Sequence, residues 1–117
     1  MNVSVVGQHE DRLAGILNSM SDQMVSREVV VGMPQGLHAR PADQLAREAR
    51  KWQSRIELLN NSQRVDGKSI LEVLTLAAEA GTRLVVEVTG PDAHEALKAI
   101  GTLFDRNFNE QENNEGR

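Results

Sequence analysis

Apolar side chains recur along the chain with spacings that predict strands and helices in a definite order. The β-branched run from Val25 to Met33 predicts a strand, which the tripeptide Pro34-Gln35-Gly36 ends. Apolar residues then recur at helical spacing up to about Lys51. That helical face consists of Ala42, Leu45, Ala46, Ala49 and Trp52.

The middle of the chain predicts a β-hairpin followed by a second helix. Residues 56–59 and 64–66 are the two expected strands, and Asn60-Asn61 is the expected tight turn between them. Ser69 and Glu72 predict a capping box, in which the hydroxyl accepts from a backbone N–H and the carboxylate reaches back. Gly81 is the expected end of this helix.

A fourth strand is predicted over residues 84–88, and Gly90-Pro91 turns the chain. Asp92 and Glu95 predict a second capping box, which opens a third helix. The order β-α-β-β-α-β-α predicts an α+β domain with one sheet and helices on one face. A ferredoxin-like domain shares the first six elements, so the pattern alone leaves both folds open. The third helix is expected to bury Ala96, Leu97, Ile100, Leu103 and Phe104.

The two ends differ in character from the domain that we expect over residues 25–108. Residues 1–24 form an N-terminal extension, in which Leu13, Ile16, Leu17 and Met20 have the spacing of one helical face. Two interpretations stay open: a short amphipathic helix, or an unstructured leader with Met24 as the true initiator. Residues 109–117 are polar and acidic, and we expect this tail to be disordered.

The length and composition exclude several classes of protein. A chain of 117 residues accommodates one domain with one core. Its lack of cysteine excludes a disulfide framework, a thiolate zinc site and a cysteine nucleophile. The sequence has no apolar run of about 18 residues and no signal-peptide pattern, so we expect a cytoplasmic location.

Charge is distributed unevenly along the chain. The net charge is −4, and the extension and the tail each contribute −2, which leaves residues 25–108 neutral. A neutral domain does not predict a broad nucleic-acid or membrane surface. Electrostatic recognition must therefore come from local patches.

One short segment carries recognisable chemistry: Gly36-Leu37-His38-Ala39-Arg40-Pro41, where the first strand gives way to the first helix. If His38 is the N-cap, the next backbone N–H groups lack intrahelical acceptors and favour an anion. Pro41 loses nothing in a first turn, and Arg40 adds a planar fork of donors suited to phosphate. Imidazole, with an ordinary pKa of about 6.5, offers a neutral nucleophile at neutral pH. The alternative is that His38 merely caps the helix and Arg40 is solvated.

This string closely resembles the active-site signature of the HPr phosphocarriers of the bacterial phosphoenolpyruvate-dependent phosphotransferase system, and the resemblance extends over residues 25 to about 108. It implies an open-faced β-sandwich, with a four-stranded antiparallel sheet and three helices on one face. It also implies that enzyme I phosphorylates His38 on the δ1 nitrogen and that His38 then donates to an EIIA protein or domain. Arg40 takes the position of the family's phosphate-binding arginine. No cofactor and no metal are expected.

Ser69 carries two interpretations. As a helix cap it contributes about 1 kcal/mol. The segment Lys68-Ser69-Ile70 also matches the family's regulatory serine, which implies phosphorylation by the HPr kinase/phosphorylase where that enzyme is present.

Partner binding is expected beside His38. Arg40, Arg47 and Lys51 share one face of the first helix, with Arg50 adjacent. Exposed apolar surface at Ile70 and Leu71, next to Lys68, would complete a site for an acid-rimmed apolar partner. The alternative is an ordinary solvated helix face. His9 and His94 have no metal-ligand spacing and are expected at the surface.

The sequence therefore predicts a stoichiometric phosphoryl carrier rather than an enzyme. A regulatory HPr paralogue, acting mainly as a phosphorylation-dependent binding module, is the second candidate. A self-sufficient hydrolase or kinase lacks support, because no nucleotide-binding glycine loop, carboxylate pair or metal cluster accompanies His38.

Overall fold

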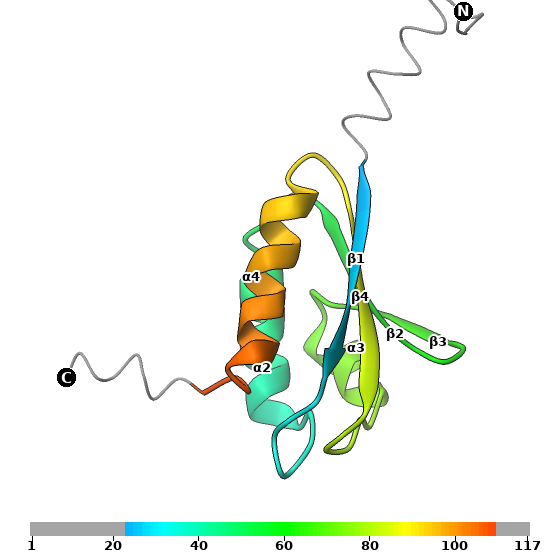
Figure 1. Ribbon diagram of the computed structural model, residues 1–117, viewed down its shortest axis with the longest axis vertical. Coiled ribbons are helices and arrows are strands. Elements are labelled where there is room, and N and C mark those ends of the chain that lie inside the picture. Colours follow the sequence, from blue (N-terminus) through cyan, green and yellow to red (C-terminus); the bar gives the residue numbers. More distant parts are fainter. Residues whose placement is uncertain (1–22, 110–117) are drawn as a thin grey trace, which may run out of the picture.

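The computed structural model describes residues 23–109, and the expected β-α-β-β-α-β-α order is confirmed (Figure 1). The apolar face proposed for Leu13 to Met20 and most of the acidic tail lie outside the described residues. Within residues 23–109, none of the helices has the length and apolar character needed to cross a membrane. The elements are β1 (Met24–Val30), α2 (Ala39–Ala49), β2 (Arg55–Asn60), β3 (Gln63–Asp66), α3 (Ile70–Thr75), β4 (Arg83–Thr89) and α4 (Ala93–Asp105).

The four strands form one antiparallel sheet in the order β1-β4-β2-β3. The helices all lie on one side of this sheet, and the other side is open (Figure 1). The open-faced α+β fold expected from the sequence is therefore confirmed.

The core lies between the sheet and the helices. Along β4, Leu84, Val86 and Val88 are buried, whereas the side chains between them are only half-buried, as expected for a sheet covered on one face. The helices complete this core with Leu45 of α2, Val73 of α3, and the buried Ala96, Ile100 and Phe104 of α4. Leu97 and Leu103, expected to be buried, pack against its border.

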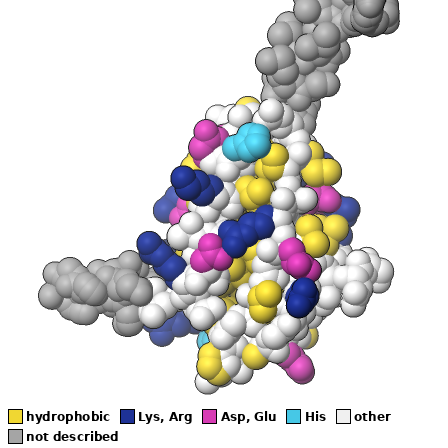
Figure 2. All heavy atoms as spheres, viewed as in Figure 1, with side chains coloured by type: hydrophobic (Ala, Val, Ile, Leu, Met, Phe, Trp, Pro, Cys, Tyr) yellow, Lys and Arg dark blue, Asp and Glu magenta, His cyan; other side chains and the backbone are white. Residues whose placement is uncertain are grey.

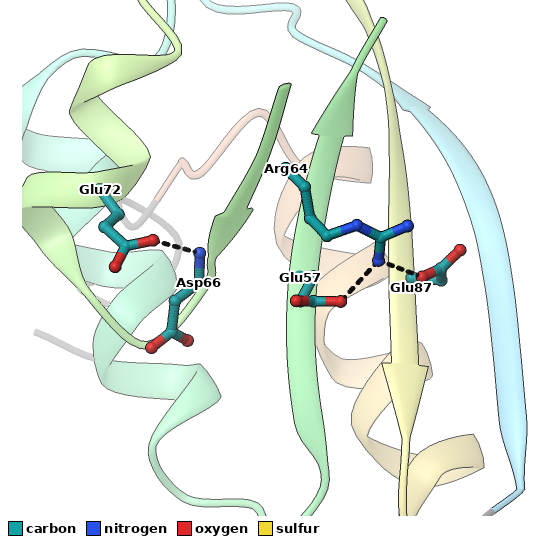
Figure 3. Close-up of polar contacts among 5 residues, drawn as sticks. All are labelled: Glu57, Arg64, Asp66, Glu72 and Glu87. Atoms are coloured by element: carbon teal, nitrogen blue, oxygen red, sulfur yellow. Dashed lines mark hydrogen bonds and ion pairs between the residues drawn. The ribbon is translucent and has the colours of Figure 1, made fainter. Parts of the chain in front are cut away.

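The open face of the sheet carries a charged network (Figure 3). Arg64 Nη1 lies 2.7 Å from Glu57 Oε1 and 2.7 Å from Glu87 Oε1, which join β3 to β2 and to β4. The hydrogen bonds that Arg64 donates to Glu87 and to Glu57 raise the pKa of its guanidinium. Because all three side chains are accessible to water, the network contributes little to stability.

Only half of the capping box predicted at Ser69 is present. Ser69 Oγ accepts from the backbone N–H of Glu72 at 3.2 Å, as expected. The Glu72 carboxylate does not return to Ser69. It accepts from the backbone N–H of Asp66 at 2.9 Å (Figure 3), because Ser69 N–H already donates to the Asp66 carbonyl. Glu72 therefore holds the end of β3 against α3.

The capping box predicted at Asp92 is wrong. Asp92 occupies the N-cap position of α4 but makes no side-chain cap hydrogen bond. Its carboxylate instead accepts from Ser54 Oγ (2.6 Å), Ser54 N–H (2.9 Å) and Gln53 N–H (3.0 Å). The buried Ser54 would otherwise lack an acceptor for its hydroxyl, so the long-range contact replaces the local cap.

Three predicted boundaries also change. The first strand ends at Val30 rather than at Met33. The second helix ends at Thr75 rather than at Gly81, and the chain turns at Ala77, where φ is +48°. Gly81 instead donates its N–H to the Val31 carbonyl at 2.7 Å, in the turn before β4. The hairpin turn lies one residue later than predicted, because Asn60 pairs with Gln63 and Asn61 takes the left-handed conformation.

The Asp92 contacts predict a pH-dependent stability. Hydrogen bonds lower the pKa of Asp92 in the folded state, and the bond from Ser54 has the largest effect. The stabilisation of the folded state by ionised Asp92 is therefore complete above the unfolded pKa of about 4 and is lost below it. Asp92→Asn should therefore be about 1 kcal/mol less stable than the original protein at pH 7, and the difference should shrink as the pH falls toward 2. Urea unfolding across this range measures both quantities. If the difference in unfolding free energy between the two proteins did not change with pH, the stabilisation would not depend on the ionised form of Asp92.

Candidate functional site

His38 lies at the start of α2, where the sequence predicted it. It is the N-cap residue, with φ −90° and ψ −166°, and its carbonyl accepts from Ala42 N–H at 2.9 Å. Its side chain makes no cap hydrogen bond and has no other partner among residues 23–109. The half-buried imidazole is therefore available for chemistry instead of closing the helix end, which argues against the simple capping role.

The first turn of α2 presents backbone donors beside His38. The N–H groups of Ala39 and Arg40 have no acceptor among the described residues, as expected for the first positions of a helix. Pro41 follows as the third helical residue and has no N–H to satisfy. No acidic residue stands in this turn, so the helix dipole there remains available to an external anion.

A cleft of about 380 Å³ opens next to the imidazole. Arg40 lies at its border, is exposed, and makes no ion pair or hydrogen bond within the described part of the chain. The cleft is lined by Met33, Pro34, Gln35, His38, Arg40, Pro41, Asn107, Phe108 and Asn109. Residues 33–41, near the start of the domain, and residues 107–109, at its end, therefore line the same cleft.

The sequence did not indicate that Asn107 and Phe108 line this cleft, because residue 108 was expected only to end the domain. Phe108 N–H donates to the Leu103 carbonyl at 2.8 Å and Asn107 N–H to the Phe104 carbonyl at 2.9 Å, the pattern of a Schellman motif. Phe108 then packs edge-on against Phe104, with 4.9 Å between ring centroids. An asparagine before an aromatic residue at the end of a helix was the signal that could have found this motif.

A second cleft, of about 280 Å³, lies between α2 and α4 and shares Phe108 and Asn109 with the first. Two of the predicted partner-binding residues, Arg47 and Lys51, line it. Arg106, the C-cap residue of α4, adds a third cation that the sequence did not single out. Arg47 pairs with Asp43 (2.9 Å) and Lys51 with Glu48 (3.1 Å), so each carries a neighbouring carboxylate.

The other predicted cations have structural contacts. Arg50 Nε donates to the Lys68 carbonyl at 3.0 Å, and Lys68 Nζ donates to the Trp52 carbonyl at 2.8 Å. These bonds join the end of α2 to the segment before α3. The predicted basic surface thus has two parts. On the α4 side, Arg47 and Lys51 pair with carboxylates of α2 itself, and on the α3 side, Arg50 and Lys68 are bonded to backbone carbonyls of other segments.

The apolar residues at the start of α3 are unequally exposed. Leu71 is 76% exposed, whereas Ile70 is half-buried and packs against the core. Ser69 lies immediately before them, also half-buried. Leu71 is therefore the apolar side chain most accessible to a partner here.

The charge distribution is mixed over the face drawn in Figure 2. Lys and Arg side chains lie among acidic and apolar ones and do not form a continuous basic stripe. Residues 23–109 also contain no group of three or more His, Cys, Asp or Glu side chains arranged to hold a metal ion.

A family model, curated relatives and solved structures all relate this chain to HPr proteins. Residues 25–106 match the family described as "PTS HPr component phosphorylation site". The phosphocarrier protein HPr of Xylella fastidiosa (strain 9a5c) is 39% identical over 87 residues, which cover 74% of this chain and 98% of that protein. HPr of Treponema pallidum (strain Nichols) is 41% identical over 88 residues, covering 75% of this chain and all of that protein. A crystal structure of HPr from Thermoanaerobacter tengcongensis superposes with a TM-score of 0.71 at 30% identity, over 74% of this chain and 97% of the other.

The contacts of the site predict which side chains serve the fold. Arg40→Ala should change the free energy of unfolding by less than about 0.5 kcal/mol, because Arg40 makes no hydrogen bond or ion pair with any residue from 23 to 109. Ser69→Ala should cost about 1 kcal/mol through loss of the cap on Glu72 N–H. Urea denaturation of both variants measures the difference. If Arg40→Ala were the more damaging change, Arg40 would be a structural residue.

Proposed function

The chain belongs to the HPr family of phosphocarrier proteins of the phosphotransferase system, and from this we propose that it accepts a phosphoryl group from enzyme I on His38 and donates it to an EIIA protein or domain. The observation that carries the proposal is the His38 imidazole at the N-cap of α2, which has no partner among residues 23–109. The N–H groups of Ala39 and Arg40, which lack acceptors within that range, follow it in the chain, and the Arg40 side chain borders the same cleft. Carbohydrate uptake or its regulation is the process served.

The step itself is a displacement at phosphorus. The lone pair of the neutral His38 ring, on Nδ1 by analogy with the family, attacks the phosphorus atom of the donor. As the new N–P bond forms, the bond between phosphorus and the donor atom breaks and leaves its electron pair on the donor. Donation reverses this exchange, with an EIIA group as the incoming nucleophile.

The surroundings of His38 favour a phosphoryl group at this point. Backbone N–H groups of Ala39 and Arg40 can donate to its oxygens, and the positive end of the α2 dipole favours their charge. The Arg40 guanidinium adds a permanent cation with paired donors. The cleft is open to solvent, so a partner can reach the phosphoryl group directly. This arrangement suits a carrier that is consumed and regenerated stoichiometrically.

Two neighbouring surfaces are our candidates for partner binding. Arg47, Lys51 and Arg106 surround the second cleft, and a carboxylate-rich partner could exchange with the local pairs at little cost because those pairs are exposed. Leu71 supplies apolar surface on the α3 side. Arg50 and Lys68 would act there mainly by holding α2 and α3 together.

Regulation through Ser69 is the second candidate function, in which the protein acts mainly as a phosphorylation-dependent binding module. The supporting observation is that Ser69 Oγ caps α3 while the side chain remains half-exposed. A phosphoryl group added there by an HPr kinase/phosphorylase would stand at a helix start, a position compatible with a negative charge. The fold would therefore survive the modification.

The assignment of His38 is tested directly. After incubation with phosphoenolpyruvate and enzyme I, the protein should carry an adduct that is labile in acid and stable in base, and His38→Ala should carry none. His94→Ala, which removes an exposed histidine of α4, is the matched control and should be labelled normally. Intact-mass spectrometry quantifies all three proteins. A normal yield with His38→Ala would contradict the assignment.

Two variants of Ser69 should distinguish its role as a helix cap from a role in regulation. Ser69→Asp retains an oxygen that can cap Glu72 N–H, so its stability should stay near that of the original protein, whereas Ser69→Ala loses the cap. In the rate of phosphorylation by an acidic partner, the two variants should rank in the opposite order. Ser69→Asp should slow phosphorylation about tenfold at low ionic strength, and less in high salt, while Ser69→Ala should not. Equal rates at low salt would leave Ser69 as a cap alone.

A further inference from the structure

The loop that carries His38 lies against the segment that connects α3 to β4. Both segments lie at the same end of the molecule (Figure 1). Leu37 N–H donates to the Ala78 carbonyl at 2.9 Å, one residue before His38. Leu37 and Ala78 are both buried, with 3% and 5% of their surface exposed. This hydrogen bond is therefore shielded from water.

The connecting segment adopts an unusual backbone conformation at Ala77. Its φ of +48° lies in the left-handed region, which residues other than glycine, asparagine and aspartate seldom occupy. Leu76 and Ala77 donate their N–H groups to Val73 and Leu74, which closes the last turn of α3 tightly. The turn at Ala77 then brings the Ala78 carbonyl to Leu37. Such strain persists where the surrounding structure over-determines it, often next to functional groups.

Close approach at Gly36 completes the contact. Gly36 has φ +79°, and a Cβ atom placed on it would lie 2.5 Å from the Ala78 carbonyl oxygen and 3.2 Å from Glu79 Cα. Both neighbours are backbone atoms, which cannot move aside as a flexible side chain can. His38 N–H in turn donates to the Gly36 carbonyl at 2.9 Å. The position of the His38 backbone is thus set through Gly36 and Leu37 by the Ala77–Ala78 bend.

We propose that the Ala77–Ala78 bend is a positioning element for phosphoryl transfer, which holds His38 in line with the first-turn donors of α2. The inference rests on the proposed function of His38. Neither Ala77 nor Ala78 lines the imidazole cleft, and no motif marks the bend in the sequence. It acts by backbone contact, and it also connects the helix that begins at Ser69 to the loop that carries His38.

Two glycines provide a matched test. Gly36→Ala and Gly81→Ala place the same methyl group at a positive φ, but a Cβ on Gly81 (φ +91°) would meet no atom within 4 Å. Only Gly36→Ala should push the two segments apart. Phosphorylation is measured over a range of phosphorylated enzyme I concentrations, which separates the maximal rate constant from the half-saturating concentration. Hydrogen exchange at the Leu37 amide is measured in parallel and requires no activity.

Gly36→Ala should lower the maximal rate constant on the order of tenfold while the half-saturating concentration stays unchanged, and its Leu37 amide should exchange faster. Gly81→Ala should match the original protein in all three quantities. Equal behaviour of the two variants would overturn the positioning role, as would a change confined to the half-saturating concentration. Failure of the original protein to accept a phosphoryl group would contradict the proposed function instead, whatever the amide exchange shows.

A second pair covers the case in which Gly36→Ala does not fold. Ala77→Val introduces a β-branched side chain at the left-handed position, whereas Ala80→Val makes the same change at an exposed residue of the same segment without positive φ. Ala77→Val should lower the maximal rate constant and speed Leu37 exchange, and Ala80→Val should do neither. Unchanged transfer in Ala77→Val, together with faster Leu37 exchange, would overturn the proposal.

Discussion

Burial of the apolar face of β4 dictates how the other elements are arranged. This strand pairs with β1 on one side and β2 on the other, and its buried Leu84, Val86 and Val88 must be covered from one direction only. Burial of each such side chain contributes about 1.5–3 kcal/mol. The helices supply the cover, and the hydrophobic face of each helix is therefore directed toward the sheet. The outer face carries the charged network of Arg64, Glu57 and Glu87, and these side chains are accessible to water (Figure 3).

The site follows from this one-sided layering. With all helices on one face, the start of α2 and the end of α4 meet at the same end of the molecule, which places His38 and Phe108 around one cleft (Figure 1). A helix start leaves backbone N–H groups without intrahelical acceptors, and an open cleft lets water satisfy them until an anion arrives. The His38 imidazole remains uncommitted because the first turn closes without it. A transferable group can therefore be held with little change in the fold.

Long-range contacts repeatedly replaced local hydrogen bonds that the sequence favoured. Asp92 and Glu72 both stand where a helix cap was expected, yet one carboxylate holds Ser54 and the other holds Asp66. The buried Ser54 would otherwise lack an acceptor, which costs more than a cap contributes, and Glu72 bonds to Asp66 because the Ser69 N–H already donates to the Asp66 carbonyl. A long-range contact also follows the early end of the second helix: α3 ends at Thr75, before Gly81, and the Ala78 carbonyl accepts from Leu37 N–H.

The order of the elements, most of the core and the place of His38 at the start of α2 could all be predicted from the amino-acid pattern. These features depend on side-chain periodicity and on residues adjacent in the chain, such as Gly36 and Pro41, whose preferences are local. Three features could be seen only after the chain had folded: Phe108 completes the cleft, Arg50 is bonded while Arg47 borders the second cleft, and Ala77 adopts a left-handed conformation. Each of these depends on atoms contributed by distant segments, and their free energies appear only once the helices pack on the sheet.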